Sequence, residues 1–337
     1  MQPLKLGIIG TGIAARELHW PALKQMPDRY QVVAVANRSR DKAEAFADMV
    51  GLKSASVYSD YCQLLARDDL DVVDLALPPQ LNYKVARAAA ESGMHVICEK
   101  PIAITMEEAH AMVALSSEFG IQVLIAENFR YDNAIRKAKM LLDEGKINSP
   151  FMLSYQYVQP VPPSDEIASR PWRQQPAHAG GCLSDHGVHM IDVIRYLMGE
   201  VAEVQVFGCD LHSYLAGMDT AVYNLKFESG AVGSIQWSFS VASEQRSIIQ
   251  LWSEDGTMQI SPDEVSVMRR GHADEAFPVS GPTSFLNEFE DFYAVLTQGQ
   301  VPLVTAQDAL RDLETVLAAY RSAIANEVIV LDRERRN

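Results

Sequence analysis

The chain has 337 residues, of which 48% are hydrophobic and 22% are charged, and its formal net charge is −15. This length suits two domains, and the composition is that of an ordinary globular protein. The acidic balance argues against a nucleic-acid-binding protein, because recognition of phosphates needs clustered Lys and Arg.

The sequence also indicates where the protein works. The first apolar run begins within a few residues of Met1 and leaves no room for a secretory signal, and no run approaches the roughly 18 apolar residues of a membrane span. Four scattered cysteines, Cys62, Cys98, Cys182 and Cys209, have apolar or strand-like neighbours, which favours reduced, buried thiols over a disulfide framework. We therefore expect a cytoplasmic protein that binds no membrane.

Up to about residue 125, short apolar runs alternate with amphipathic helical stretches. Such alternation is typical of βαβ units, so we predict a doubly wound parallel sheet, a Rossmann domain, over residues 1–125. The expected strands are Lys5–Gly10, Gln31–Ala36, Ala55–Tyr58, Val72–Leu77, Met94–Cys98 and Ile121–Ala126, and the expected helices include Asp41–Met49, Leu81–Ser92 and Thr105–Glu118. The last helix begins with Thr105 and Glu108 at capping-box spacing.

After Asp132 the pattern changes to one with fewer helices. Residues 202–268 alternate with period two and contain hairpin signals at residues 228–230 and 254–256. We predict a second α/β domain, residues 126–337, with a large and mainly antiparallel sheet. Its other expected elements are the helix Ala134–Leu142, the strand Phe151–Val158, a proline-rich loop over 160–176, a helix near Ser184–Met198 and the helix Ala306–Asn326.

One face of this sheet is expected to be unusually apolar. Alternating sets place Val222, Leu225, Phe227, Ile235, Trp237 and Phe239 there. A homodimer or homotetramer formed through the sheet would cover this surface, although a large core within the domain explains it equally well.

The segment Gly10-x-Gly12-x-x-Ala15 has the form that a dinucleotide pyrophosphate requires. The first glycine permits a tight turn, the second lets the backbone approach the phosphates, and a small third residue allows close helix–strand packing. A helix N-terminus follows and favours anions. We therefore expect Gly10, Thr11, Gly12, Ile13 and Ala14 to bind the cofactor.

The end of the second strand predicts which dinucleotide is bound. An acidic residue is usual there for the free ribose of NAD, but this chain has Asn37-Arg38-Ser39. Because arginine and serine suit a 2′-phosphate, we expect NADP in preference to NAD. A solvated loop at a helix start would explain the same residues.

Lys100 follows the apolar run Met94–Cys98 in the triplet Glu99-Lys100-Pro101. The carboxyl end of such a strand faces the crevice in which open α/β sheets bind ligands. Lys100 could there stabilise charge on a reacting oxygen.

The stretch Gly180–Asp192 carries a second set of polar residues. Asp185 and His189 share one face of the expected helix, and His189 has the intrinsic pKa of a general base at neutral pH. Gly187 costs the helix about 1 kcal/mol relative to Ala, which suggests a close neighbour. A lone helical histidine is more often structural; here a dinucleotide motif and a cleft lysine support the catalytic interpretation.

The same stretch contains metal-ligand types in Cys182, Asp185, His186 and His189. Four ligands from one short helix cannot readily surround an ion tetrahedrally, so we expect no metal.

In order along nearly the whole chain, these motifs resemble those of the glucose–fructose oxidoreductase/inositol 2-dehydrogenase (Gfo/Idh/MocA) family. The resemblance includes the glycine fingerprint, Glu99-Lys100-Pro101, Ala126–Tyr131, Trp172-Arg173 and Gly180–Asp192. It implies Lys100, Asp185 and His189 as the catalytic set, with a Lys100–Pro101 bond that is commonly cis in relatives.

The resemblance also implies further binding residues. Leu77, Pro78, Asn82 and Glu99 match segments along the cofactor, and Arg130, Trp172 and Arg173 would line the substrate cleft. Cys182 and His186 depart from the usual family pattern beside the substrate, and His186 is taken as a further substrate contact.

We expect an NAD(P)-dependent enzyme that transfers hydride to or from a sugar, polyol or related cyclic alcohol, a small neutral molecule. A trans-dihydrodiol dehydrogenase is one alternative. A dinucleotide-binding sensor or scaffold without chemistry is another, although such relatives usually lack the lysine or the histidine. The natural substrate and the reaction direction stay open.

Overall fold

The computed structural model describes residues 2–166, 168–242 and 245–331, apart from the side chains of Ala55, Pro171 and Trp172. It divides into two compact units. The first contains the residues up to Tyr131 together with Thr283–Leu310, and the second contains Asp132–Pro282 with the residues from Arg311 onward. The sequence placed a single boundary at residue 125, so the return of Thr283–Leu310 to the first unit is a feature that it did not predict.

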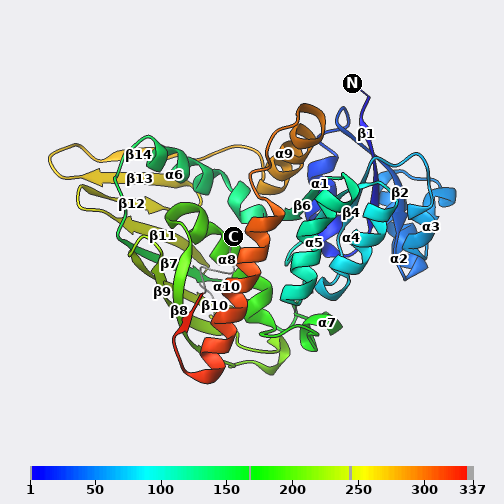
Figure 1. Ribbon diagram of the computed structural model, residues 1–337. Coiled ribbons are helices and arrows are strands. Elements are labelled where there is room, and N and C mark those ends of the chain that lie inside the picture. The colour runs from blue at the N-terminus through cyan, green and yellow to red at the C-terminus, as the bar shows by residue number, and fades with distance from the viewer. Residues whose placement is uncertain (1, 167, 243–244, 332–337) are drawn as a thin grey trace. The chain divides into compact units, whose positions relative to one another are not determined.

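The first unit is built on a six-stranded parallel sheet in the order β3-β2-β1-β4-β5-β6, which confirms the predicted doubly wound fold (Figure 1). Helices cover both faces of this sheet, so its strands are apolar without alternation. The strands are β1 (Leu4–Ile9), β2 (Tyr30–Ala36), β3 (Val57–Tyr58), β4 (Val72–Leu75), β5 (His95–Glu99) and β6 (Val123–Ala126).

The helices of the first unit begin and end where the local sequence provides caps. In α5, the Thr105 hydroxyl accepts a hydrogen bond from the Glu108 amide, and the helix ends at Gly120 in the left-handed conformation. The helical segments are η1 (Ala14–His19), α1 (Trp20–Leu23), α2 (Arg40–Val50), η2 (Ser54–Ser56), α3 (Tyr61–Leu65), η3 (Pro79–Leu81), α4 (Asn82–Glu91), α5 (Met106–Phe119), η4 (Asn128–Tyr131) and α9 (Ser284–Gln298).

Helix α9 completes the core of the first unit although it comes from late in the chain. It packs beside α1, and its Phe289 and Phe292 are almost fully buried (Figure 1). Phe289 contacts the ring of Tyr30, whose hydroxyl donates to the Phe289 carbonyl over 2.9 Å. The apolar face of α9 therefore belongs to the same core as Leu6 and Ile8 of β1.

The second unit contains a nine-stranded sheet in the order β14-β13-β12-β11-β7-β10-β9-β8-β15. Every neighbouring pair is antiparallel except β7 and β10, as the sequence predicted for the most part. The strands are β7 (Met152–Val158), β8 (Val201–Cys209), β9 (Thr220–Phe227), β10 (Val232–Ser238), β11 (Arg246–Trp252), β12 (Gly256–Ile260), β13 (Glu264–Arg269), β14 (Glu275–Pro278) and β15 (Ile329–Val330). The helical segments are α6 (Asn133–Asp143), α7 (Pro171–Gln174), α8 (Cys182–Met198), η5 (Ser213–Leu215) and α10 (Ala306–Ala325), which begins in the first unit.

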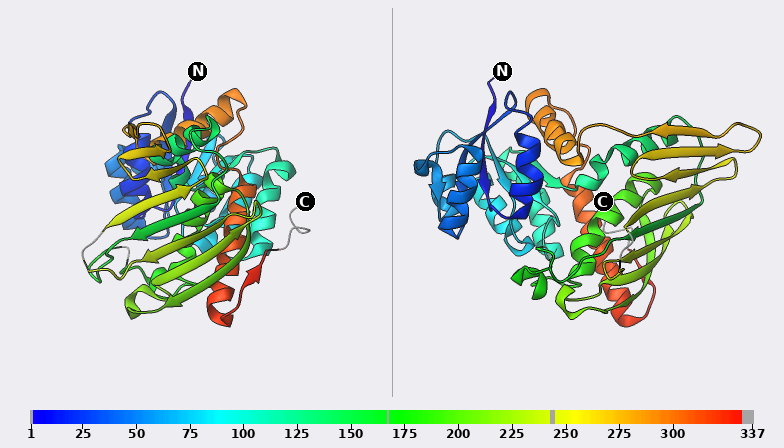
Figure 2. Two further views of the ribbon diagram at one scale, coloured as in Figure 1. Left: turned by 90° about the vertical axis from the view of Figure 1, so that its left-hand side faces the viewer. Right: turned by 180° about the vertical axis from the view of Figure 1, so that it is seen from behind.

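Helices cover one face of this sheet and leave the other open (Figure 2, left). The predicted assignment of six apolar residues to the face away from the helices was wrong for five of them. Leu225, Phe227, Ile235, Trp237 and Phe239 are buried, and of the six residues named only Val222 is exposed. The surplus of apolar side chains therefore fills the core of the second unit.

All four cysteines are free, but only Cys98 and Cys182 are buried, so the prediction of four buried thiols was wrong for Cys62 and Cys209. Among the described residues, none of the helices has both the length and the apolar composition that crossing a bilayer requires.

Candidate active site

The glycine turn after β1 contacts the carboxyl end of β2 and the residue that follows β4. Gly10 has a φ of +96°, and a Cβ atom there would collide with the Ala76 carbonyl oxygen beyond β4. The Gly10 amide donates to the Ala36 carbonyl of β2 over 2.8 Å. Only glycine permits this conformation and this close approach.

The turn has the features that a dinucleotide needs. The Thr11 hydroxyl is buried and has no hydrogen-bond partner within the part of the chain that the structure describes. A buried polar group without a partner is costly, so a bound phosphate or a water that accepts its hydrogen bond would stabilise it. Helical residues 14–23 follow and direct free amides toward the turn. These residues fit the predicted cofactor, which would supply hydride transfer there.

Residues after β2 lie beside this turn. The Asn37 side chain accepts a bond from the Thr11 amide over 3.4 Å and donates to the Ser39 carbonyl over 3.0 Å. Arg38 and Ser39 are exposed. Arg40 is ion-paired with Glu44 at 2.7 Å, whereas Arg38 has no ion-pair partner among the described residues.

Lys100 follows the carboxyl end of β5, as predicted, and its bond to Pro101 is cis. Asn82 is fully buried, and its side-chain amide donates to the Glu99 carbonyl over 2.7 Å and to the Pro101 carbonyl over 2.9 Å. The backbone is thus held on both sides of Lys100. Leu77, predicted to lie along the cofactor, lies beside Gly10.

Sequence reasoning missed a buried charged cluster next to Lys100. Nδ1 of His19 lies 2.9 Å from the Asp74 carboxylate, and Nε2 lies 3.1 Å from Glu99. The side chains of His19 and Asp74 are fully buried. Burial alone would lower the pKa of His19, but the two carboxylates raise it well above its usual value, so the imidazole is a cation at neutral pH.

Glu288 of α9 is a third buried acid near this cluster. Burial raises its pKa well above the usual range, and the neighbouring carboxylates of Glu99, Glu127 and Asp74 add to this effect against the opposing charge of His19. Glu288 therefore keeps its proton to a higher pH than an ordinary glutamate does. The sequence around Glu288 gives no indication of a buried acid. Asp74, in contrast, is a charged residue within an apolar strand, and this pattern could have indicated a buried charge.

In the second unit, α8 carries two of the three predicted catalytic residues, Asp185 and His189. It begins after Gly181, where a φ of +52° and the nearby Ala216 carbonyl leave no room for a side chain. Asp185 is 3% exposed and lies 2.6 Å from the Arg173 guanidinium. His189 lies one helical turn further and is 5% exposed. Asp185, a predicted catalytic residue, and Arg173, a predicted substrate contact, thus form an ion pair.

The first turn of α8 forms one wall of a concavity in the second unit with about 350 Å³ of space, part of which opens to solvent. Most of its other side chains are apolar or aromatic, and Arg173, His178 and Asp185 provide its charged or polar groups. Such a site suits a ligand with one apolar face and one polar edge. The concavity is lined by Val161, Ala168, Arg173, Pro176, His178, Gly181, Cys182, Asp185, Tyr214, Leu215 and Phe239.

The imidazole of His186 is surrounded by other aromatic rings. Its ring centroid is 4.6 Å from that of Tyr157, 4.8 Å from Phe239 and 5.6 Å from His189. Its role as a substrate contact stays a prediction. The Trp172 side chain lies outside the described part of the chain.

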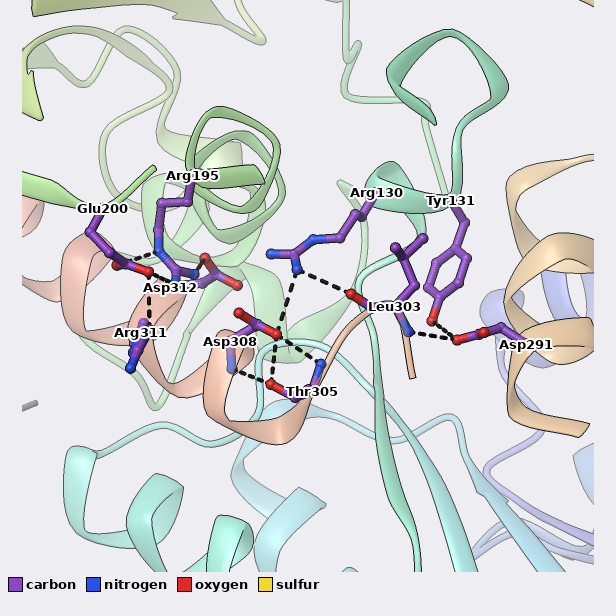
Figure 3. Close-up of polar contacts among 10 residues, drawn as sticks. All are labelled: Arg130, Tyr131, Arg195, Glu200, Asp291, Leu303, Thr305, Asp308, Arg311 and Asp312. Carbon is purple, nitrogen blue, oxygen red and sulfur yellow. Dashed lines mark hydrogen bonds and ion pairs between the residues drawn. The ribbon is translucent and has the colours of Figure 1, made fainter. Parts of the chain in front are cut away.

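Arg130 was predicted to contact substrate, but it is 5% exposed and has internal partners (Figure 3). Its guanidinium lies 3.5 Å from Asp308 and donates to the Leu303 carbonyl over 3.2 Å. The part that Arg130 plays in substrate binding stays a prediction. Among the described residues there is no group of three or more side chains that could hold a metal ion.

The doubly wound sheet and its glycine turn define a dinucleotide-binding protein with a second α/β domain. Residues 4–127 match the sequence model of an oxidoreductase family with an NAD-binding Rossmann fold, and residues 139–330 match the C-terminal α/β domain of that family. The chain therefore belongs to the Gfo/Idh/MocA oxidoreductase family.

Two dehydrogenases and a solved structure are similar over much of the chain. D-xylose 1-dehydrogenase (NADP(+)) 2 of Haloferax volcanii is 28% identical over 98% of this chain and 100% of that protein. Levoglucosan dehydrogenase of Pseudarthrobacter phenanthrenivorans is 32% identical over 70% of this chain and 67% of that protein. The crystal structure of an oxidoreductase from Thermotoga maritima is 36% identical, covers 98% of both chains and has a TM-score of 0.90.

Proposed function

We propose that this protein is an NAD(P)-dependent dehydrogenase that oxidises a ring hydroxyl of a sugar, polyol or related cyclic alcohol, or catalyses the reverse reduction. The observation that carries the proposal is the concavity of the second unit, in which Arg173 holds Asp185 one helical turn before His189. Its apolar walls suit the face of a sugar ring, and its polar edge suits hydroxyl groups. Similarity to dehydrogenases of xylose and levoglucosan supports the same substrate class.

Each residue has a role in this proposal. NAD(P), held at the glycine turn after β1, would supply the chemistry of hydride transfer. Lys100 donates a hydrogen bond to the reacting oxygen and stabilises the charge that develops on it. His189 removes the proton from that oxygen in the oxidation and returns it in the reduction. Asp185, fixed by Arg173, orients the substrate.

The test is a direct assay at 340 nm. Purified protein is mixed with NADP or NAD and a panel of D-xylose, other aldoses, levoglucosan, cyclic polyols and trans-dihydrodiols. Turnover of a sugar or polyol supports the proposal, and turnover of a dihydrodiol alone supports the dihydrodiol dehydrogenase alternative. Tight cofactor binding without turnover of any compound would instead favour a sensor or scaffold.

The cofactor preference proposed is NADP over NAD. Arg38 is exposed beside the predicted ribose position and is not engaged in an ion pair with any described residue, so it is available to a 2′-phosphate. Comparison of kcat/KM for the two cofactors tests this preference.

We also propose that the protein forms a homodimer or homotetramer through the open face of its nine-stranded sheet. Phe207 and Val222 pair across β8 and β9 on this face, and both are exposed. Exposed apolar neighbours of this kind are typical of an interface. The four free thiols support a reducing compartment, the cytoplasm, as its location.

A further inference from the structure

A continuous chain of hydrogen bonds connects the middle of β4 to the backbone of Lys100. Asp74 contacts Nδ1 of His19 at 2.9 Å, and Nε2 of His19 contacts Oε1 of Glu99 at 3.1 Å. The other oxygen of Glu99, Oε2, accepts a hydrogen bond from the Lys100 amide over 3.2 Å. Each imidazole nitrogen and each Glu99 oxygen thus has a defined contact.

His19 is held in place from every side that the structure describes. Its ring centroid lies 5.8 Å from that of Phe285 and 5.5 Å from that of Phe289, both on α9. Asp74 from β4, Glu99 from β5 and Glu288 from α9 lie around the same imidazole, which is 0% exposed. Such an enclosed ring has little freedom to rotate, so it defines the position of the Glu99 carboxylate.

The geometry also explains why a histidine is needed. A single side chain must bridge two carboxylates that approach from opposite directions, and it must carry positive charge to offset theirs in a buried site. The two nitrogens of a protonated imidazole meet both requirements. A smaller amide could contact one carboxylate and would leave the other without its partner.

We propose that His19 is a positioning residue for Lys100, acting through the Glu99 carboxylate that His19 fixes and that receives the Lys100 amide. This inference rests on the proposed function, in which Lys100 contacts the reacting oxygen. Asn82 holds the carbonyls on either side of Lys100, and the His19–Glu99 pair fixes the amide between them. Together they set the direction from which the lysine side chain leaves the backbone.

Two amide variants separate the contacts of His19. In His19→Asn the amide nitrogen takes the place of Nδ1, so the Asp74 contact is kept and the Glu99 contact is lost. In His19→Gln the amide nitrogen takes the place of Nε2, so the Glu99 contact is kept. Both variants lose the positive charge, and a purely structural role would affect both alike. His95→Gln is the matched control, because His95 lies at the other end of the same strand, β5.

The first readout is kinetic. We expect His19→Asn to lower kcat by about tenfold to a hundredfold, since a small misplacement of a group at the reacting atoms has effects of this size. His19→Gln should retain kcat within about threefold of the unaltered enzyme, a loss too small to reflect displacement of Lys100. His95→Gln should leave kcat unchanged.

The second readout needs no substrate. Lysines are reductively methylated with ¹³C-formaldehyde in the full-length protein, and the Lys100 signal is identified by its absence from Lys100→Arg. We expect this signal to shift in His19→Asn and to keep its position in His19→Gln and His95→Gln. An unchanged signal in His19→Asn would overturn the inference, even if the enzyme proves inactive on every compound of the panel.

Thermal unfolding of each variant guards against misfolding. If His19→Asn does not fold, the double variant with Asp74→Asn removes the buried carboxylate that has lost a cationic partner and still lacks the Glu99 contact. Equal kcat losses in His19→Asn and His19→Gln would indicate a structural role and would also overturn the inference.

Discussion

Asp74 illustrates how a single buried charge organises its neighbours. Its carboxylate lies within a strand whose residues are all buried, and without His19 it would be an unpaired charge. Loss of one partner of a buried pair typically costs about 3–5 kcal/mol. His19 therefore contributes to folding as well as to the position of Glu99, and the two roles need separate measurements.

The buried proton sites predict how stability depends on pH. A raised pKa in the folded state means that the folded protein holds a proton that the unfolded chain releases. The stabilisation that the folded state gains from the proton on His19 is complete below about pH 6.5, and it is lost as the pH rises through the higher folded pKa. The corresponding stabilisation from the proton on Glu288 begins to fall from about pH 4.3. We expect the free energy of unfolding to decrease as the pH rises above about 6.5.

Glu288→Gln mimics the neutral acid, so it should reduce this pH dependence. Guanidinium unfolding at several pH values measures the change. Glu290→Gln, the same substitution at a partly exposed position of α9, should keep the slope of the unaltered protein. A slope that Glu288→Gln leaves untouched would contradict a protonated Glu288.

The catalytic residues give a prediction of their own. Lys100→Met and His189→Ala should each lower kcat by at least about a hundredfold, because each removes an acid/base or charge-stabilising group. Steady-state kinetics with the best compound of the panel checks this. The exposed Lys84 and His272 provide matched controls, Lys84→Met and His272→Ala, which should keep full activity. Retained turnover in either test variant would remove that residue from the mechanism.

Arg38 tests the cofactor preference. Arg38→Ala should raise KM for NADP by about tenfold or more, the value of a charge-assisted hydrogen bond to phosphate, and should leave KM for NAD within about twofold. Arg40→Ala serves as the comparison, because Arg40 is already paired with Glu44. If Arg38→Ala changed KM equally for both cofactors, Arg38 would not contact the 2′-phosphate.

At the scale of elements, helix α8 depends on one close contact with α10. A Cβ atom on Gly187 would lie 2.7 Å from Cγ2 of Val316. This contact confirms the expectation that a neighbour explains a glycine within the helix. Of α8, nearly every residue up to Leu197 is buried, so the helix that carries Asp185 and His189 has no solvent-facing side.

We therefore expect Gly187→Ala to lower the free energy of unfolding by about 1–3 kcal/mol through overpacking. The double variant Gly187→Ala/Val316→Ala should be less destabilised than the sum of the two single variants. Chemical denaturation of all four proteins gives the coupling energy. Strict additivity would mean that the two helices separate to admit the methyl group.

Most elements could be predicted from sequence because their signals are local. Period-two alternation identified β9 and β10, and the glycine turn identified the end of β1. Helix α9 was not predicted, and neither was its return to the first unit, because the sequence of an amphipathic helix does not show which other element the helix packs against. For the same reason the pairing of His19 with Asp74 and Glu99, and the internal partners of Arg130, came only from the structure.

A second buried ion cluster shows the same limit. Arg195 of α8 pairs with Glu200 at 2.8 Å and with Asp312, and Arg311 pairs with Glu200 at 3.1 Å (Figure 3). The neighbouring carboxylates raise the pKa of Arg195 against the effect of burial. This cluster joins α8 to α10 within the second unit, and no motif in the sequence predicted it.

At the scale of the whole molecule, the open sheet face predicts the state of assembly. One row across it consists of Phe207, Val222, Gln236, Gln156 and Ile248, and the Gln156 amide donates to Gln236 over 2.8 Å. If this face is buried between copies, Phe207→Lys/Val222→Lys should convert the oligomer to monomers, because like charges would meet at the interface. Light scattering after size exclusion measures the mass. Val301→Lys, at a position 81% exposed in the first unit, should leave it unchanged.

The late position of Thr283–Leu310 in the chain affects how the protein is made. A ribosome finishes the strands of the nucleotide-binding half well before it reaches the stretch containing Phe289 and Phe292. At ordinary translation speeds the delay is on the order of ten to thirty seconds. Throughout that interval the nascent polypeptide exposes the apolar surface around Tyr30 that α9 later covers. Chaperones can bind this surface until the helix emerges.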